Sequence, residues 1–223
     1  CIGCVWLVWG GSQQETEDLR TADLIVVISK DEEDQLRQRG LKNILWSPPL
    51  VEPSHFFLTA QVGIVGSANK FNQEGLLWLS KVAAPKIPIT LYGSLAQFST
   101  WADVEKIVRY EDSLEPYQNC GVILMPTALG MGVQIKAVEA LAAGRAIVAR
   151  AGAMRGLPPG KGAWIEVTSP EEMWEQAALF SAHQQLREEQ GAKARAYYQQ
   201  HLDAKKLRTD LRTAYSALVK SKN

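Results

Sequence analysis

Short runs of aliphatic and β-branched residues alternate along this chain with polar segments of helical periodicity. The run LIVVIS at 24–29 is apolar at every position except its last, which is typical of a strand buried on both faces of a parallel sheet. A helix-length segment, KDEEDQLRQRG at 30–40, follows with acids in its first turn and arginines near its end. The same order recurs along the chain, and it predicts βαβ units in a doubly wound α/β fold.

A proline cluster, PPLVEP at 48–53, interrupts this alternation and is the clearest linker candidate in the sequence. Before the cluster, the expected elements are strands at 4–9, 24–29 and 43–47 and helices at 12–22, capped by Ser12, and 30–40. Beyond it, the expected strands lie at 61–67, 88–93, 107–110, 121–126, 146–149 and 163–167. The expected helices there lie at 72–83, 100–106, 114–120 and 132–143, followed by a long helical tail at 170–219.

The two groups of elements differ in size. Residues 1–50 hold two or three strands, whereas a complete doubly wound domain usually has more than about 100 residues. We therefore expect a Rossmann-like parallel sheet over residues 51–202, the remnant of a second Rossmann-like domain over residues 1–50, and a C-terminal helix over residues 203–223.

The charge and cysteine content narrow the class of protein. The 24 lysines and arginines balance the 24 aspartates and glutamates, so no net positive charge favours nucleic acid or anionic lipid. No apolar run approaches the roughly 20 residues that span a bilayer. Cys1 and Cys4 form a CxxC inside an apolar run, and no second pair completes a zinc site. With three cysteines in all, we expect no disulfide framework, no metal and a reducing, cytoplasmic location.

The most informative segment is GMGVQIKAVEALAAGRAIVA at 130–149, which directly follows the loop after the apolar run GVILMP. Gly130 and Gly132 allow a close approach of backbone to ligand, and the first turn of a helix here offers N–H groups to an anion. At about 100° per residue, Gly132, Lys136 and Glu139 share one stripe beside the apolar stripe that packs on the sheet. We expect both side chains to face a ligand, because a carboxylate so placed can bind sugar hydroxyls. Alternatively, the glycines serve only the packing of strand against helix, and the lysine and glutamate form a surface pair.

Parallel sheets of this kind bind ligands beyond the carboxyl ends of their strands. The loops expected at that edge are 66–74, 93–99, 110–115 and 126–133. The absence of a third glycine after Gly132 does not support a dinucleotide fingerprint.

The glycine segment resembles the donor-binding segment of bacterial retaining glycosyltransferases with the GT-B fold, the large group-1 or family 4-like glycosyl transferases. The matching positions are Pro126, Gly130, Gly132, Val133, Gln134, Lys136, Glu139, Ala140, Leu141, Gly144 and Arg145. Ile135 and Ala146 depart from the family pattern, which usually has a polar residue and a proline there.

Other segments resemble the same family in the same order. The stretch VGIVGSANKFNQEGLLWL at 62–79 is similar to the opening of the family's C-terminal domain, with Phe71 in place of a proline. The segment at 23–40 resembles the end of its N-terminal domain, and the resemblance covers roughly residues 23–182.

The resemblance implies a nucleotide-diphosphate sugar, UDP- or GDP-linked, that is bound without a metal or other cofactor. Glu139 would bind the ribose, and the residues from Gly130 to Val133 would face the diphosphate and the donor sugar. Lys136 or Lys70 would act in catalysis by neutralising the leaving diphosphate, as a lysine beside a helix N-terminus can. The other residues implied in donor binding are Gly66, Ser67, Val108, Arg109, Tyr110, Met131 and Gly132, of which Met131 stands where many relatives have a glutamate that contacts the sugar.

The resemblance further implies transfer, with retention, to a glycan or lipid-linked acceptor in polysaccharide or cell-envelope glycan synthesis.

The acidic run at 31–34 is interpreted as the solvated start of a helix and not as a metal site. Since only part of the acceptor-side domain is expected, we expect the chain to bind the donor but to transfer poorly alone. Self-association through the C-terminal helix and peripheral association with the inner face of the membrane are left open.

Two other classes of function remain at this point. The first is a catalytically silent nucleotide-binding or scaffold protein of GT-B ancestry, which Met131 and the short N-terminal region favour. The second is a sugar-nucleotide epimerase of similar fold. That chemistry needs acids and histidines that converge on the sugar, whereas His55, His183 and His201 are scattered along the chain.

Overall fold

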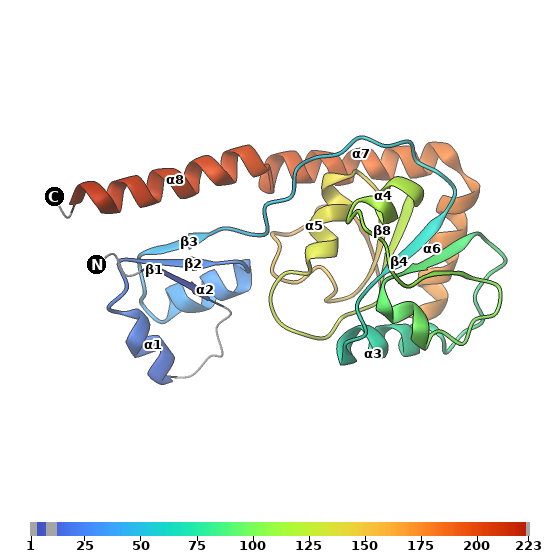
Figure 1. The fold of residues 1–223 in the computed structure, drawn as a ribbon, viewed down its shortest axis with the longest axis horizontal. Coiled ribbons are helices and arrows are strands. Elements are labelled where there is room, and N and C mark those ends of the chain that lie inside the picture. The colour runs from blue at the N-terminus through green and yellow to red at the C-terminus, as the bar shows by residue number, and fades with distance from the viewer. Residues whose placement is uncertain (1–3, 8–12, 222–223) are drawn as a thin grey trace.

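A computed structural model describes residues 4–7 and 13–221 of the chain, and all of the strands there pair in parallel in two sheets (Figure 1). The first sheet has the order β1-β2-β3, formed by β1 (Cys4–Leu7), β2 (Leu24–Val27) and β3 (Ile44–Trp46). The second has the order β6-β5-β4-β7-β8-β9. Its strands are β4 (Val62–Val65), β5 (Ile89–Tyr92), β6 (Glu105–Ile107), β7 (Val122–Met125), β8 (Ala146–Arg150) and β9 (Ile165–Val167). The expected α/β, Rossmann-like fold is confirmed.

Helices cover both faces of the six-stranded sheet. Successive residues of a strand point to opposite faces, so Ile123 and Met125 pack on one side while Val122 and Leu124 pack on the other. The first side carries α4 (Glu115–Asn119), α5 (Ile135–Ala142) and α7 (Gln184–His201), and the second carries α3 (Lys70–Leu79), the 3-10 helix η1 (Ser94–Phe98) and α6 (Pro170–Ala182). Because both faces are buried, the inner strand β7 is apolar throughout instead of alternating, whereas the outer strands β6 and β9 include charged residues.

The remaining helices are α1 (Gln13–Leu19), α2 (Lys30–Gln38) and α8 (Ala204–Ser221). Figure 1 shows α8 continuing beyond α7 above the three-stranded sheet. Within the described ranges, no helix is both long and apolar enough to cross a membrane. Cys1, Ser12 and the last two residues of the strand expected at 4–9 lie outside the described residues.

Two expectations about the elements are wrong. The segment at 100–106 is not a helix: η1 ends before it, and residues 105–107 form β6, which starts earlier than the expected strand at 107–110. The side chains of Trp101 and Val104 pack against the α3 and α6 core, which accounts for the helix-like apolar spacing. The long helical tail is three separate helices, and α8 begins where the Asp203 carboxylate accepts the backbone N–H groups of Lys205 and Lys206.

The acidic run at 31–34 is only in part a solvated helix face, since Asp31 and Asp34 are exposed. Glu32 and Glu33 are buried. Burial acts to raise the pKa of Glu33, but hydrogen bonds from Lys30 and Arg37 outweigh it, and the pKa is lowered from its ordinary value. Asp31 accepts the backbone N–H of Gly156 at 3.0 Å, from the loop after β8. The run therefore joins the first sheet to the second, and no cluster of metal-ligating side chains occurs in the part of the chain that the structure describes.

The segment between the sheets, residues 47–60, has no helix or strand and runs beside α7 (Figure 1). Arg145 stabilises this segment. Its side chain is fully buried and donates to the carbonyl oxygens of Phe56 at 2.9 Å and Phe57 at 3.1 Å. It also donates to the Ala143 carbonyl oxygen at the end of α5. Arg195, from α7, donates to the Ser54 carbonyl oxygen at 3.0 Å. The side chains of Arg145 and Arg195 thus supply hydrogen bonds in place of the regular backbone pairing that this segment lacks.

The Arg145→Met substitution should lower the free energy of unfolding by about 2–4 kcal/mol, because it removes the donors of the Phe56 and Phe57 carbonyl oxygens and one of the two donors of the Ala143 carbonyl oxygen. Urea unfolding followed by circular dichroism measures this loss, and limited proteolysis should cut first within residues 47–60. Arg212→Met, at an exposed position of α8, is the matched control and should change stability by less than about 0.5 kcal/mol. Equal stabilities of the two variants would contradict this account of the buried arginine.

Candidate functional site: a pocket at the carboxyl edge of the second sheet

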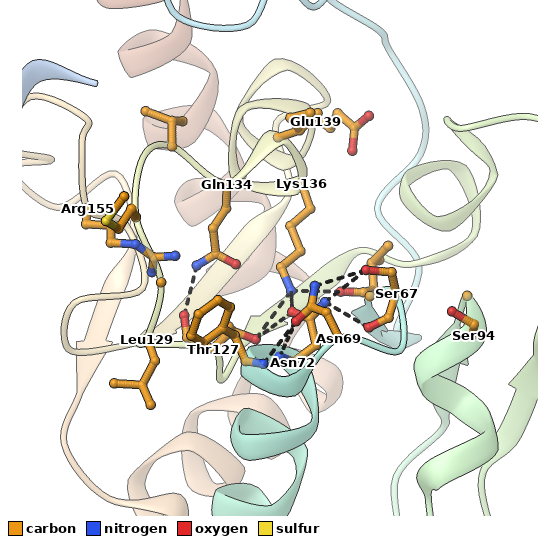
Figure 2. Close-up of a pocket in the computed structure, with 18 of the residues that line it drawn as sticks. Ser67, Asn69, Asn72, Ser94, Thr127, Leu129, Gln134, Lys136, Glu139 and Arg155 are labelled. Carbon is orange, nitrogen blue, oxygen red and sulfur yellow. Dashed lines mark hydrogen bonds between the residues drawn. The ribbon is translucent and has the colours of Figure 1, made fainter. Parts of the chain in front are cut away.

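A pocket of about 560 Å³ opens where β4, β5 and β7 end (Figure 2). The loops after these strands supply most of its lining, together with the first turns of α3 and α5. Eight residues expected from the sequence line it, namely Gly66, Ser67, Tyr110, Gly130, Met131, Val133, Lys136 and Glu139. The location therefore agrees with the rule that parallel sheets bind ligands at their carboxyl edge.

Glycines allow the walls of this pocket to approach one another. A Cβ at Gly75 would lie 2.9 Å from the carbonyl carbon of Pro126 and the nitrogen of Thr127, so only glycine lets α3 touch the loop after β7. Gly130 has a φ of +116°, a backbone conformation that residues with a side chain rarely adopt. Gly75 thus serves the packing of α3, whereas Gly130 shapes the pocket that it lines.

Lys136 extends from the first turn of α5 to the polar floor of the pocket (Figure 2). Its ammonium donates to the Val65 carbonyl oxygen and the Asn72 Oδ1, both at 3.0 Å, and lies 3.5 Å from the Thr127 Oγ1. Burial, and then the positive charge of Arg155, lower the pKa of Lys136 from its ordinary value to about 8. The lysine is therefore charged at neutral pH and close to its titration point.

Asn72 organises the floor around this lysine. Its side-chain oxygen also accepts the Thr127 hydroxyl at 3.0 Å, and its Nδ2 donates to the Ser67 carbonyl oxygen at 2.9 Å. Asn69 caps α3 by accepting the backbone N–H groups of Phe71 and Asn72. The start of α3 is thereby fixed against the ends of β4 and β7.

Glu139 lies one turn further along α5, with its side chain partly buried. Tyr117, from α4, donates its hydroxyl to Oε2 of this carboxylate at 2.7 Å. Burial raises the pKa of Glu139, and the Tyr117 hydrogen bond acts in the opposite direction. Oε1 makes no hydrogen bond with any described residue, so it is available to accept hydroxyl groups of a ligand.

Four of the expected site residues do not line the pocket. Lys70 is exposed, its ammonium lies 5.0 Å from the centre of the Phe71 ring, and it lines a different surface groove with Gln73 and Glu74. Arg109 is exposed, and Val108 packs against the α3 and α6 core. The remaining residue, Gly132, has a φ of +69° and lies next to Ile28 of the first sheet.

Sequence reasoning missed Arg155, which lines the pocket from the loop after β8. That loop follows a predicted strand and so belongs to the carboxyl edge, but it was not counted among the ligand-facing loops. Asn69, Ser94 and Thr127 were also not expected as site residues, although they lie in loops that were.

The pocket has a polar floor and an apolar rim. Phe71, Leu129, Met131 and Ile135 are exposed around its mouth, and Met131 is 67% exposed. Among the described residues that line the pocket there is neither histidine nor cysteine. Two cations, one carboxylate and a glycine turn suit the binding of a ligand that has both anionic groups and hydroxyl groups.

Comparison with solved structures places this fold among GT-B glycosyltransferases. TarM of S. aureus, solved with UDP, aligns at 14% identity and a TM-score of 0.68, over 90% of this chain and 45% of TarM. HepE of Anabaena, solved with UDP and glucose, aligns at 15% identity and a TM-score of 0.73, over 96% of this chain and 71% of HepE. Sucrose-phosphate synthase of Thermosynechococcus elongatus aligns at 17% identity and a TM-score of 0.74, over 95% of this chain and 64% of the synthase. At these identities the likeness shows the fold.

The family is shown by a sequence model. The model of the glycosyl transferase-like family matches residues 74–211, which is more than half of the chain and includes α5 and most of the pocket. The chain therefore belongs to the glycosyl transferase-like family, as the glycine segment indicated. Comparison with curated protein sequences gives no match. The chain spans less than half the length of TarM.

The Asn72→Asp substitution tests the floor of the site. A carboxylate 3 Å from the Lys136 ammonium should raise the pKa of that lysine above about 8, because an opposite charge stabilises the protonated form. Titration of the lysine Cε resonances by NMR measures the shift. Gln73→Glu adds the same charge one residue further along α3, outside the pocket, and should leave the Lys136 pKa near about 8. An unchanged Lys136 pKa in Asn72→Asp would show that the ammonium is not held on this floor.

Proposed function

We propose that this chain binds a nucleotide-diphosphate sugar and holds it for transfer to an acceptor by a glycosyltransferase. The observation that carries the proposal is the composition of one pocket, where a half-buried carboxylate, a glycine turn and a buried lysine meet at the carboxyl edge of the sheet. A donor of this class needs groups for hydroxyls, for two phosphates and for a flat base, and the pocket has candidates for all three.

In this proposal Glu139 binds the ribose. Its Oε1 can accept ribose hydroxyls, while Tyr117 keeps the carboxylate oriented through Oε2. The base lies beside Tyr110, whose ring lines the pocket and contacts Tyr92 edge-on at 5.7 Å. Arg109 and Val108 contribute through the backbone of the same segment, since their side chains point elsewhere.

The diphosphate lies against the glycine turn at the start of α5. Free N–H groups of a helix N-terminus and a nearby ammonium both favour negative charge, and they stabilise the diphosphate as it leaves. We assign this part to Lys136 in preference to Lys70, because Lys136 lines the pocket and Lys70 lies outside it. No metal is assigned, since these groups can balance the leaving charge.

Transfer itself needs an acceptor-binding part. Donor binding by this chain is proposed here, and weak transfer by the chain alone stays a prediction. Several finer points stay predictions. They are retention of anomeric configuration, hexose as the sugar, a glycan or lipid-linked acceptor in polysaccharide or cell-envelope synthesis, and a cytoplasmic location at the inner membrane face. Self-association through the C-terminal helix also stays a prediction.

A second candidate is a silent nucleotide-binding protein of the same ancestry. Met131 favours it, since this exposed side chain stands where many related transferases carry a glutamate that contacts the sugar. The two candidates share nucleotide binding and differ in turnover. Slow hydrolysis of the bound sugar nucleotide, which release of the nucleoside diphosphate reports, favours the transferase.

Calorimetric titration with UDP, GDP, ADP and CDP tests the binding site. UDP is the first choice because TarM and HepE were solved with it. Glu139→Ala should weaken the diphosphate that binds by roughly 10- to 100-fold, since a hydrogen bond to a charged group contributes about 1.5–3 kcal/mol. Glu175→Ala, at an exposed position of α6, is the control and should bind as the wild type does. Failure of every diphosphate to bind the folded chain would overturn the proposal.

Binding should also take up a proton at mildly alkaline pH. The pKa of Lys136 is about 8 in the free protein, and a bound diphosphate raises it by favouring the charged ammonium. Affinity should therefore be greatest below about pH 8 and fall as the pH rises through the free-protein value. Titrations at pH near 8.5 in buffers of different ionisation enthalpy measure the uptake, and Lys136→Met should abolish it. Binding without uptake in the wild type would contradict this role of Lys136.

A further inference from the structure

Arg155 has hydrogen-bond donors that the protein itself does not use. Its Nη1 donates to the carbonyl oxygens of Ala128 at 3.2 Å and Gly152 at 3.4 Å, which fastens one side of the guanidinium. Its Nε is buried without a hydrogen-bond partner, and no hydrogen bond from Nη2 to a described residue is found. A buried donor without an acceptor is unfavourable, and an oxyanion would remove that penalty.

The guanidinium lies directly against the glycine turn. A Cβ at Gly130 would be only 2.7 Å from Nη2 of Arg155, so a side chain at this position would displace the guanidinium. Gly130 therefore does more than permit a positive φ, since it keeps the space above the turn open for Arg155. Figure 2 shows Arg155 and Glu139 on opposite sides of Lys136.

Arg155 and Lys136 are not equivalent cations. The Lys136 ammonium has three N–H groups, and three protein oxygens, on Val65, Asn72 and Thr127, lie within hydrogen-bond distance of it. It contributes its charge to the pocket but has few donors left for a ligand. The Arg155 guanidinium carries both charge and unused donors, in the planar arrangement that matches two oxygens of a phosphate. Glu139 is the one carboxylate among the described lining residues, and it faces Tyr117.

The loop that carries Arg155 is hydrogen-bonded to the first turn of α2, which lies between strands β2 and β3 of the first sheet in the sequence. Gly156 donates its N–H to Asp31 at 3.0 Å and accepts the Lys30 backbone N–H at 2.8 Å. Its φ is +76°, and a Cβ there would lie 2.7 Å from the Ser29 Oγ. The N-terminal end of α2 thus fits tightly against the residue next to Arg155.

We propose that Arg155 binds the distal phosphate of the donor diphosphate, and that Asp31, in the first turn of α2, positions Arg155 for this contact. The assignment rests on the proposed function, in which Glu139 holds the ribose. With the ribose at Glu139, the phosphate furthest from it reaches the side of the pocket that Arg155 occupies. Arg155 is then a ligand-binding residue, and Asp31 is a positioning residue that acts through Gly156 and through its negative charge near the guanidinium.

The test compares each nucleoside diphosphate with its monophosphate, starting with UDP and UMP. In the wild type we expect UDP to bind more tightly than UMP. Arg155→Met should reduce that preference by about tenfold or more by weakening UDP, with UMP changed by less than about threefold. Arg155→Lys keeps the charge without the planar pair of donors. Its preference for UDP over UMP should lie between those of the wild type and Arg155→Met. Arg212→Met, on α8, is the matched control and should keep the full preference.

Asp31→Ala tests the positioning role. It should reduce the preference for UDP over UMP by about threefold, and adding it to Arg155→Met should cause no further reduction, because both changes act on one contact. Thermal unfolding of each variant verifies that the fold persists. Equal weakening of UDP and UMP binding in Arg155→Met would overturn the assignment of Arg155 to the distal phosphate. An additive effect of Asp31→Ala in the double variant would overturn the positioning role of Asp31. If UDP binding depends on Glu139 but not on Arg155, the proposed function stands and this inference fails. If no diphosphate binds the folded wild type, both fail.

Discussion

The buried ammonium of Lys136 is the interaction on which the pocket depends. Removing this charge from water is costly, and oxygens from the end of β4, the start of α3 and the loop after β7 offset the cost. Three elements therefore meet at one atom, and Lys136 is 71 positions from Val65 and 64 positions from Asn72 in the sequence. Burial in this arrangement, and then the positive charge of Arg155, lower the pKa of the lysine to about 8, and its hydrogen-bond acceptors include no carboxylate that would offset this shift.

This arrangement is possible only because the backbone segments around it approach so closely. Gly75 lets α3 contact the loop after β7, and Gly93 lies so close to Gly66 that a Cβ there would be 2.4 Å from the Gly66 carbonyl oxygen. These contacts bring the carboxyl ends of β4, β5 and β7 within reach of one ligand. The polar groups on the floor are thus placed by steric contacts behind them.

The fold and the centre of the site could be predicted from the sequence because both follow local patterns. Apolar runs separated by helical periodicity define parallel strands, and the helical stripe through Lys136 and Glu139 places both side chains at the pocket. The errors came from contacts between distant segments. TWADVEK has a helix-like apolar spacing because Trp101 and Val104 pack onto a core that is built elsewhere. Lys70 shares the first turn of α3 with the pocket residues Phe71 and Asn72, but it points to the outer side of the helix.

The acidic segment at the start of α2 also shows that contacts between distant segments could not be predicted from the local sequence. Acids at a helix start are favoured by the helix dipole alone, so their presence carries no information about distant partners. Asp31 nevertheless accepts a hydrogen bond from Gly156, which is 125 positions further along the chain. Trp46 adds a second connection, because its ring packs against the cores of both sheets. The loop after β8 is consequently hydrogen-bonded from two sides. Gln134, from the glycine segment before α5, donates to the Ala153 carbonyl oxygen at 2.7 Å, and Asp31 of α2 accepts the N–H of Gly156. A movement of the first sheet relative to the second must therefore stretch this loop, and the pocket is coupled to the contact between the sheets.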